Sequence, residues 1–176
     1  MELKTDAILK GPIWADTLER LVGTVFKTYW DVYALSISIG MMHDCQIESD
    51  DMVPEGYDAE PKSVPRTVLG HSQNKALLEF MLQTAMITTK HLDLDENERL
   101  EIAFNDDKKP EFNPVAFLTK YANYGITMIK DVIDDTDDTF GRFYPHLYTV
   151  WSLFRTKETS FVYQDKRGLF MLFGAK

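Results

Sequence analysis

The sequence predicts a mostly α-helical protein, a single-domain multi-helix bundle with a small C-terminal β-hairpin. Three observations lead to this expectation. The length of 176 residues suits one domain with one hydrophobic core. Apolar side chains recur at helical spacing over most of the chain. The stretch 160–176 instead contains two apolar runs separated by a turn with a glycine. We therefore expect residues 1–176 to fold as one helical domain.

The N-terminal part of the chain predicts two helices. Pro12 suits the first turn of a helix that we expect over about 12–22, because its missing N–H would be unpaired there in any case. Thr28 and Asp31 form a capping-box-like pair at the start of a second helix. Apolar residues cover most of its circumference, which predicts a buried central helix. We expect it to end near residue 39, with Gly40 as a left-handed C-cap.

The middle of the chain predicts a loop and two further helices. Residues 48–65 combine acids with prolines and a glycine, a mixture that predicts a mobile loop without a helix or a central strand. A second buried helix is expected over about 74–90, and a short amphipathic helix over 95–104. The face of the longer helix that we expect in the core is formed by Leu77, Phe80, Met81, Thr84 and Ile87.

The most regular helical pattern begins at Asn113 and Pro114 and continues to about residue 133. Aromatic residues then predict a helix over about 146–156. The runs Ser160–Tyr163 and Leu169–Phe173 predict the two strands of the hairpin. The expected core residues of the five or six helices are Trp30, Leu35, Leu77, Phe80, Leu118, Ile126 and Ile129.

Charge and composition exclude several function classes. The chain has 19 basic and 28 acidic residues and a net charge of −9, so its average field repels phosphate and direct binding to duplex DNA is not expected. The single cysteine, Cys45, is too few for an internal disulfide or a zinc finger, which favours a reducing, cytoplasmic location. No signal peptide and no apolar run of the roughly 20 residues needed to cross a membrane are visible.

Motifs for catalysis are weak in this sequence. It contains no phosphate-binding loop, no dinucleotide fingerprint and no nucleophile elbow. Neighbouring residues of a chain point in different directions, so the adjacent His43, Asp44 and Cys45 do not predict a catalytic triad. Asp93, Asp95 and Asn97 match only the opening of a calcium loop. We therefore expect no catalytic residue and no cofactor.

An acidic cluster follows the most regular helix. Hard cations such as magnesium prefer carboxylate ligands, and aspartates near the negative end of a helix would be stabilised by a cation or by a basic partner. The alternative is a solvated loop. The weak metal-ligand candidates are Asp131, Asp134, Asp135, Asp137 and Asp138.

The C-terminal run is apolar on both alternating faces, so something must cover both of them. Either this strand completes the core of the domain, or it docks into a partner. If it docks, the aromatic region from Tyr144 to Phe154 is its expected companion. The partner-binding candidates are Leu169, Phe170, Met171, Leu172, Phe173, Trp151 and Phe154.

Two stretches carry a resemblance to a known group of proteins. Residues 26–40 (FKTYWDVYALSISIG) and 117–125 (FLTKYANYG) resemble segments of small bacterial helical proteins encoded beside DNA phosphorothioation and phage-defence genes. The resemblance implies a non-catalytic protein-interaction subunit of an anti-phage defence or DNA-transaction complex. Its protein partner would be an ATPase, nuclease or helicase subunit, and oligomerisation stays open. Two alternatives are an acidic phage- or plasmid-encoded inhibitor that mimics nucleic acid, and a metal-dependent enzyme that uses Asp131–Asp138.

Overall fold

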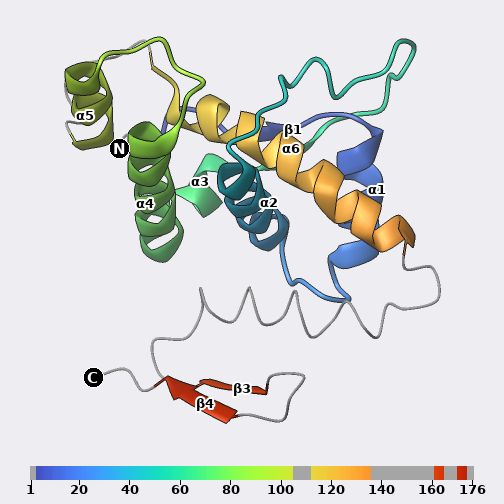
Figure 1. Ribbon diagram of the computed structural model, residues 1–176. Helices are drawn as coiled ribbons and strands as arrows, with labels where there is room; N and C mark the ends of the chain where they lie inside the picture. Colours follow the sequence, from blue (N-terminus) through green and yellow to red (C-terminus); the bar gives the residue numbers. More distant parts are fainter. Residues whose placement is uncertain (1–2, 105–111, 136–160, 165–169, 174–176) are drawn as a thin grey trace. The chain divides into compact units, whose positions relative to one another are not determined.

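The computed structural model describes residues 3–104, 112–135, 161–164 and 170–173 (Figure 1). The chain divides into two compact units, Met1–Asp138 and Thr139–Lys176, and each is described by itself. The expectation of a single domain stays a prediction. None of the described helices is both long and apolar enough to cross a membrane. The helices are α1 (Pro12–Leu21), α2 (Tyr29–His43), α3 (Arg66–Leu69), α4 (Ser72–Thr88), α5 (Glu96–Phe104) and α6 (Pro114–Asp135).

Helices α2 and α6 form the centre of the first unit, where α6 crosses α2 at very short distance (Figure 1). Two glycines permit this approach. A Cβ atom at Gly125 would lie 1.9 Å from the backbone oxygen of Ser36, and one at Gly40 would lie 2.1 Å from the backbone oxygen of Tyr121. The expected C-cap at Gly40 is therefore wrong. Gly40 lies inside α2, and the helix ends instead at Asp44, which has left-handed backbone angles (φ 46°, ψ 49°).

The expected starts of α1 and α2 are confirmed. Pro12 opens α1, and Thr28 caps α2. The hydroxyl of Thr28 accepts a hydrogen bond from the Asp31 amide at 3.3 Å, and the Asp31 carboxylate accepts one from the Thr28 amide at 3.1 Å. This reciprocal pair satisfies two amides that a helix start leaves without intrahelical partners.

Buried polar side chains connect the helices around this centre. The indole nitrogen of Trp14 donates to Asn123 Oδ1 at 2.9 Å, and Asn123 Nδ2 donates to the carbonyl oxygen of Ile47 at 3.0 Å. The hydroxyls of Tyr33 and Thr119 lie 2.9 Å apart. Burial raises the pKa of Tyr33 far above its ordinary value, so this phenol stays neutral and hydrogen-bonded.

A small antiparallel sheet joins β1 (Ala7–Leu9) and β2 (Lys62–Val64), with Ala7 opposite Val64. This N-terminal sheet is not expected from the sequence, and β2 corrects the end of the loop expected over 48–65. Each strand has only three residues, and the pairing connects distant parts of the chain, so local patterns do not reveal it. Prolines lie directly before and after β2, where they remove no hydrogen bond from the pair.

The second unit contains β3 (Phe161–Gln164) and β4 (Phe170–Phe173), which pair antiparallel with Phe161 opposite Phe173. β4 falls within the run expected over Leu169–Phe173, and β3 overlaps the run expected over Ser160–Tyr163 but extends to Gln164, which was expected in the turn. The helix expected over 146–156 lies outside the described residues. The mostly helical fold with a small antiparallel sheet is thus confirmed. The sheet within the first unit is N-terminal and is not the expected C-terminal hairpin.

The expected core is confirmed on α2 and α6 but not on α4. Trp30, Leu35, Leu118, Ile126 and Ile129 are buried as expected. On α4, however, Phe80 is 61% exposed, Ile87 is 62% exposed and Leu77 is only half-buried. Apolar residues surround α4 on all sides, so helical spacing alone does not show which side is the inner one. The buried residues of α4 are Leu78, Met81, Leu82, Ala85 and Met86.

Candidate protein-interaction surface

One side of α4 carries large apolar side chains that face away from the core. We call Ala76, Phe80, Gln83 and Ile87 the outer face of α4. Their spacing of four, three and four residues places them along one side of the helix, opposite the buried side chains of the same helix. Ala76, Phe80 and Ile87 are exposed, and Gln83 is half-buried. An apolar stripe of this kind on a folded surface is typical of a protein-interaction site.

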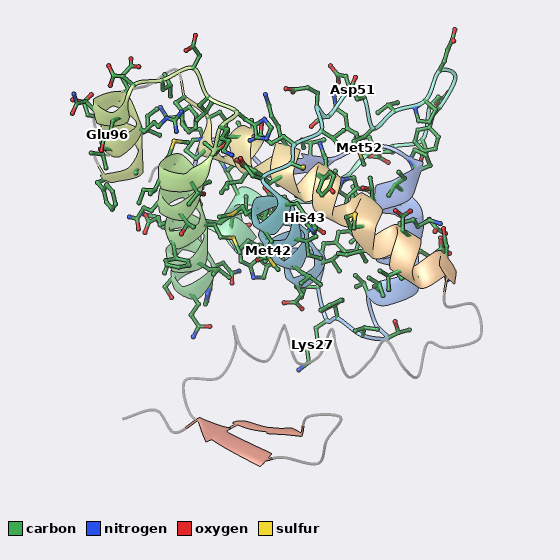
Figure 2. The ribbon with its side chains drawn as sticks, viewed as in Figure 1. Lys27, Met42, His43, Asp51, Met52 and Glu96 are labelled. Carbon is green, nitrogen blue, oxygen red and sulfur yellow. The ribbon has the colours of Figure 1, made fainter. Side chains whose placement is uncertain are left out.

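Neighbouring helices flank α4 on two sides. Figure 1 shows α4 between α2 and α5, and α4 contacts both of them. Helix α5 adds two exposed apolar side chains, Leu100 and Phe104. At the C-terminal end of α2, Met42 is 82% exposed (Figure 2). Exposed apolar side chains therefore occur on all three helices.

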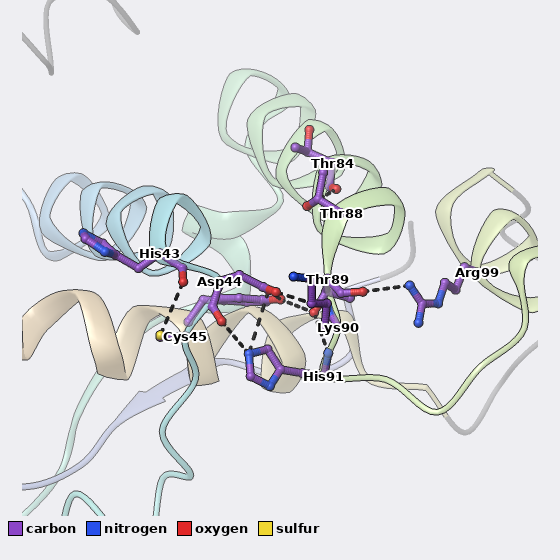
Figure 3. Close-up of polar contacts among 10 residues, drawn as sticks. His43, Asp44, Cys45, Thr84, Thr88, Thr89, Lys90, His91 and Arg99 are labelled. Atoms are coloured by element: carbon purple, nitrogen blue, oxygen red, sulfur yellow. Dashed lines mark hydrogen bonds and ion pairs between the residues drawn. The ribbon is translucent and has the colours of Figure 1, made fainter.

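A cluster of polar contacts joins the C-terminal ends of α2 and α4 to α6 (Figure 3). We call it the Asp44 junction, formed by Asp44, Thr89, Lys90, His91 and Tyr121. One carboxylate oxygen of Asp44 accepts the Lys90 amide at 3.2 Å. The Tyr121 hydroxyl lies 3.1 Å from the other carboxylate oxygen and 2.6 Å from the Thr89 hydroxyl. His91 Nε2 lies 2.5 Å from the carbonyl oxygen of Asp44.

The junction stabilises the charged form of Asp44. Desolvation pushes the pKa of this carboxyl upward. Hydrogen bonds from the Lys90 amide and from the hydroxyls of Tyr121 and Thr89, together with His91, outweigh it and hold the pKa below its ordinary value of 3.8. Burial, with a smaller contribution from the nearby Asp44 carboxylate, raises the pKa of Tyr121, whose hydroxyl therefore remains a donor. The ionised Asp44 carboxylate and the hydrogen-bond donors around it fix the end of α4 relative to α2 and α6.

Arg99 fixes the connection from α4 to α5. Its guanidinium group donates to the backbone carbonyls of Thr89 at 2.7 Å, Leu92 at 2.8 Å and Leu94 at 3.0 Å. Asp95 and Glu98 then cap the start of α5, because each carboxylate accepts the backbone amide of the other residue. The Asp95 carboxylate, which resembled part of a calcium loop, thus caps a helix. These contacts hold α5 beside α4.

We expect Asp44→Asn to lower the free energy of unfolding near neutral pH by about 1 kcal/mol, because hydrogen bonds to an ionised acceptor are stronger than those to an amide. Asparagine tolerates left-handed backbone angles, so the change tests the charge and not the backbone. A carboxyl with a lowered folded-state pKa stabilises the fold fully above its unfolded value of 3.8, and this contribution disappears as the pH falls through the lower folded value. Urea unfolding should show the two proteins converging below pH 3.8. A constant difference across that range would contradict the role of the Asp44 charge.

The acidic cluster is only partly within the described residues. Asp134 lies 2.8 Å from the guanidinium of Arg20 and also pairs with Lys130, which in turn lies 3.2 Å from Asp16. The hydrogen bond from Lys130 is the main reason that the pKa of Asp134 is lowered. Asp131 is exposed. The side chain of Asp135 and residues Asp137 and Asp138 lie outside the described part.

These ion pairs bear on the metal-site hypothesis. The Asp134 carboxylate already interacts with two cations of the protein itself, so a metal ion would have to displace them. Within the described ranges, no three His, Cys, Asp or Glu side chains are grouped so that they could hold a metal. The contacts of Asp134 are those of a residue that joins α1 to α6.

The side chains of the partner-binding residues expected at the C-terminus lie outside the described part of the chain. Leu169, Trp151 and Phe154 lie outside the described residues, and only the backbone is described for Phe170, Met171, Leu172 and Phe173 in β4. Nearer the N-terminus, the consecutive His43, Asp44 and Cys45 point in different directions. Cys45 Sγ contacts the His43 carbonyl at 3.4 Å, while the Asp44 carboxylate contacts the Lys90 amide.

The sequence does not predict the outer face of α4, because helical spacing places its two large apolar residues, Phe80 and Ile87, in the core. The apolar pattern of α4 does indicate such a surface, since a helix with apolar side chains all around it needs a contact on every side.

Comparison with models of protein families, with curated proteins and with solved structures finds no match. The stretches 26–40 and 117–125 lie mainly in α2 and α6, which pack against each other. The resemblance therefore concerns the central helix pair and names no residue of the outer face.

Proposed function

We propose that the chain is a non-catalytic protein-interaction subunit of a bacterial anti-phage defence or DNA-transaction complex. The outer face of α4 is the observation that carries the interaction part of this proposal. The resemblance of residues 26–40 and 117–125 supports the defence part. In this proposal the chain is cytoplasmic, and another chain supplies the ATPase, nuclease or helicase activity and contacts the nucleic acid.

The energetics of the outer face favour a protein partner. Complete burial of a phenylalanine or isoleucine side chain stabilises a complex by roughly 1.5–3 kcal/mol each. Phe80 and Ile87 leave most of their surface available for this. The Asp44 junction and Arg99 already fix the connection that follows α4, so binding there would order few additional residues. A rigid apolar stripe suits recognition better than catalysis.

The apolar residues 169–173 and the aromatic region 144–154 are proposed as a second contact with the partner. The net charge of −9 agrees with a partner that is a protein and not duplex DNA. The nucleic-acid mimic and the metal-dependent enzyme receive less support, because Asp134 is paired with Arg20 and Lys130.

Affinity purification of the tagged chain, co-expressed with its native neighbouring genes, tests this function. We expect mass spectrometry and light scattering to show a stoichiometric complex with another protein. The variant Phe80→Ala/Ile87→Ala should lose most of that protein, because central interface residues commonly contribute about 2 kcal/mol or more each.

The matched control is Ile8→Ala, which shortens an exposed apolar side chain on β1 and leaves α4 unchanged. We expect this variant to retain the complex. A chain that elutes alone, as a monomer or a homodimer, with all neighbouring gene products present would contradict the proposed function.

A further inference from the structure

We propose that the outer face of α4 accepts one amphipathic helix of a protein partner, and that this helix carries basic residues toward the end of α4 where α5 begins. This inference rests on the proposed function and adds the chemistry of the partner segment. It follows from the spacing of the apolar residues and from the distribution of charge beside them.

The spacing indicates a helical partner. Ala76, Phe80, Gln83 and Ile87 repeat at intervals of four, three and four residues, which is the pattern of a seam between two packed helices. At about 1.5 Å per residue this stripe is roughly 16 Å long, enough for three turns of a partner helix. Gln83 near its middle offers one polar position that fixes the register of the two helices.

The outer face itself is electrically neutral. None of its four residues is charged. On the flank, Lys75 and Glu79 lie 3.7 Å apart and form an ion pair within α4. A partner helix must therefore present an uncharged apolar side to this surface, because an unpaired charge buried there would be costly.

The surroundings become acidic at the C-terminal end of α4. Asp93 and Glu96 are exposed on the segment where α5 begins, and Glu96 is labelled on α5 in Figure 2. The guanidinium of Arg99 binds the carbonyls of Thr89, Leu92 and Leu94, which holds these carboxylates near the end of α4. Because the Arg99 guanidinium is bound to backbone oxygens, it does not neutralise these two carboxylates. Lys90 is the other basic residue near the start of α5. Basic residues of a partner helix would be attracted to these carboxylates, and added salt would weaken this attraction because it screens charges over about 10 Å.

Two synthetic helical peptides of about 18 residues provide the probes. Both carry leucines at the spacing of the outer face, and their flanks carry lysines in one peptide and glutamates in the other. In titrations of the full chain followed by NMR, we expect the lysine peptide to bind at least about tenfold more tightly at low salt. It should shift resonances of Phe80 and Ile87. Equal binding of the two peptides, or shifts confined to other helices, would overturn the inference.

Variants separate the apolar contribution from the charged one. Phe80→Ala/Ile87→Ala should weaken the lysine peptide about tenfold or more, and Asp93→Asn/Glu96→Gln should weaken it several-fold and reduce its salt dependence. The control Asp58→Asn/Glu60→Gln removes two exposed acids from the loop before β2 and should leave binding unchanged. Equal losses in the control would show attraction by net charge alone and would overturn the inference.

An experiment on the free chain tests whether the outer face is instead covered by another segment of the same chain or by a second copy of it. A soluble paramagnetic probe should broaden the Ile87 methyl resonance, because this side chain is exposed. A shielded Ile87 in a monomer would assign the face to another segment of the same chain, and a shielded Ile87 in a dimer would assign it to a second copy. Either result overturns the inference. The proposed function is tested separately. A native complex that survives Phe80→Ala/Ile87→Ala would be consistent with the proposed function but would contradict the proposal that a partner helix binds the outer face of α4.

Discussion

Gly125→Ala is expected to lower the free energy of unfolding by about 3 kcal/mol, since added volume in a packed core forces the backbone to move. A methyl group at this position would lie 1.9 Å from the backbone oxygen of Ser36. That atom belongs to α2 and has no rotamer by which to escape. The two central helices would have to separate, which disturbs every contact across them. The loss exceeds the gain of about 1 kcal/mol that alanine brings inside an unconstrained helix.

Chemical unfolding followed by circular dichroism measures this effect. Gly40→Ala should act similarly, because its Cβ would lie 2.1 Å from the backbone oxygen of Tyr121. Gly70→Ala is the matched control, since the nearest atom to its Cβ is 3.1 Å away and its φ of −77° is open to any residue. A Gly125→Ala protein as stable as the Gly70→Ala protein would show that α2 and α6 do not approach this closely.

Asn123→Ala is expected to cost about 3 kcal/mol, because it leaves buried polar groups without partners. The indole N–H of Trp14 loses its acceptor, and the carbonyl of Ile47 loses its donor. Trp14 is fully buried and Asn123 is 1% exposed, so water does not replace the indole bond without a rearrangement, whereas Ile47 is half-buried. The change also separates α1 and the segment after α2 from α6, which Asn123 joins.

Tryptophan fluorescence and urea unfolding together report on this site. Ser49→Ala serves as the control, because Ser49 receives only a longer hydrogen bond of 3.3 Å from the same amide and is half-buried. We expect Ser49→Ala to change stability by less than about 0.5 kcal/mol. If both variants lose the same amount, the buried indole bond is not the main contribution of Asn123.

The sequence predicted the helices well wherever their ends have local chemical signals. Pro12 and the Thr28–Asp31 pair mark helix starts through hydrogen bonds and backbone angles that involve only neighbouring residues. The same local chemistry predicts a C-cap at Gly40, and this prediction is wrong. Its role is to admit the backbone of Tyr121, a residue far away in the chain. Close approach between distant helices is a tertiary property and leaves no mark in the neighbouring residues.

The candidate site was harder to predict than the fold. Helical spacing correctly indicated that α4 is apolar, but only packing decides that Leu78 faces inward and Phe80 outward. The Asp44 junction combines the residue that follows α2 with residues from the segment after α4 and from α6. None of these pairings has a characteristic spacing. The sequence therefore shows which types of side chain are present but not which of them contact each other in the folded chain.

The outer face of α4 is a surface of the folded chain and not part of its core. Urea unfolding of the free chain tests it by comparing Phe80→Ala/Ile87→Ala with Leu78→Ala/Leu82→Ala on the buried side of the same helix. We predict a loss of less than about 1 kcal/mol for the outer pair and at least about 4 kcal/mol for the buried pair. Equal losses would show that the outer face is already covered in the folded chain, and would contradict its role as a docking surface.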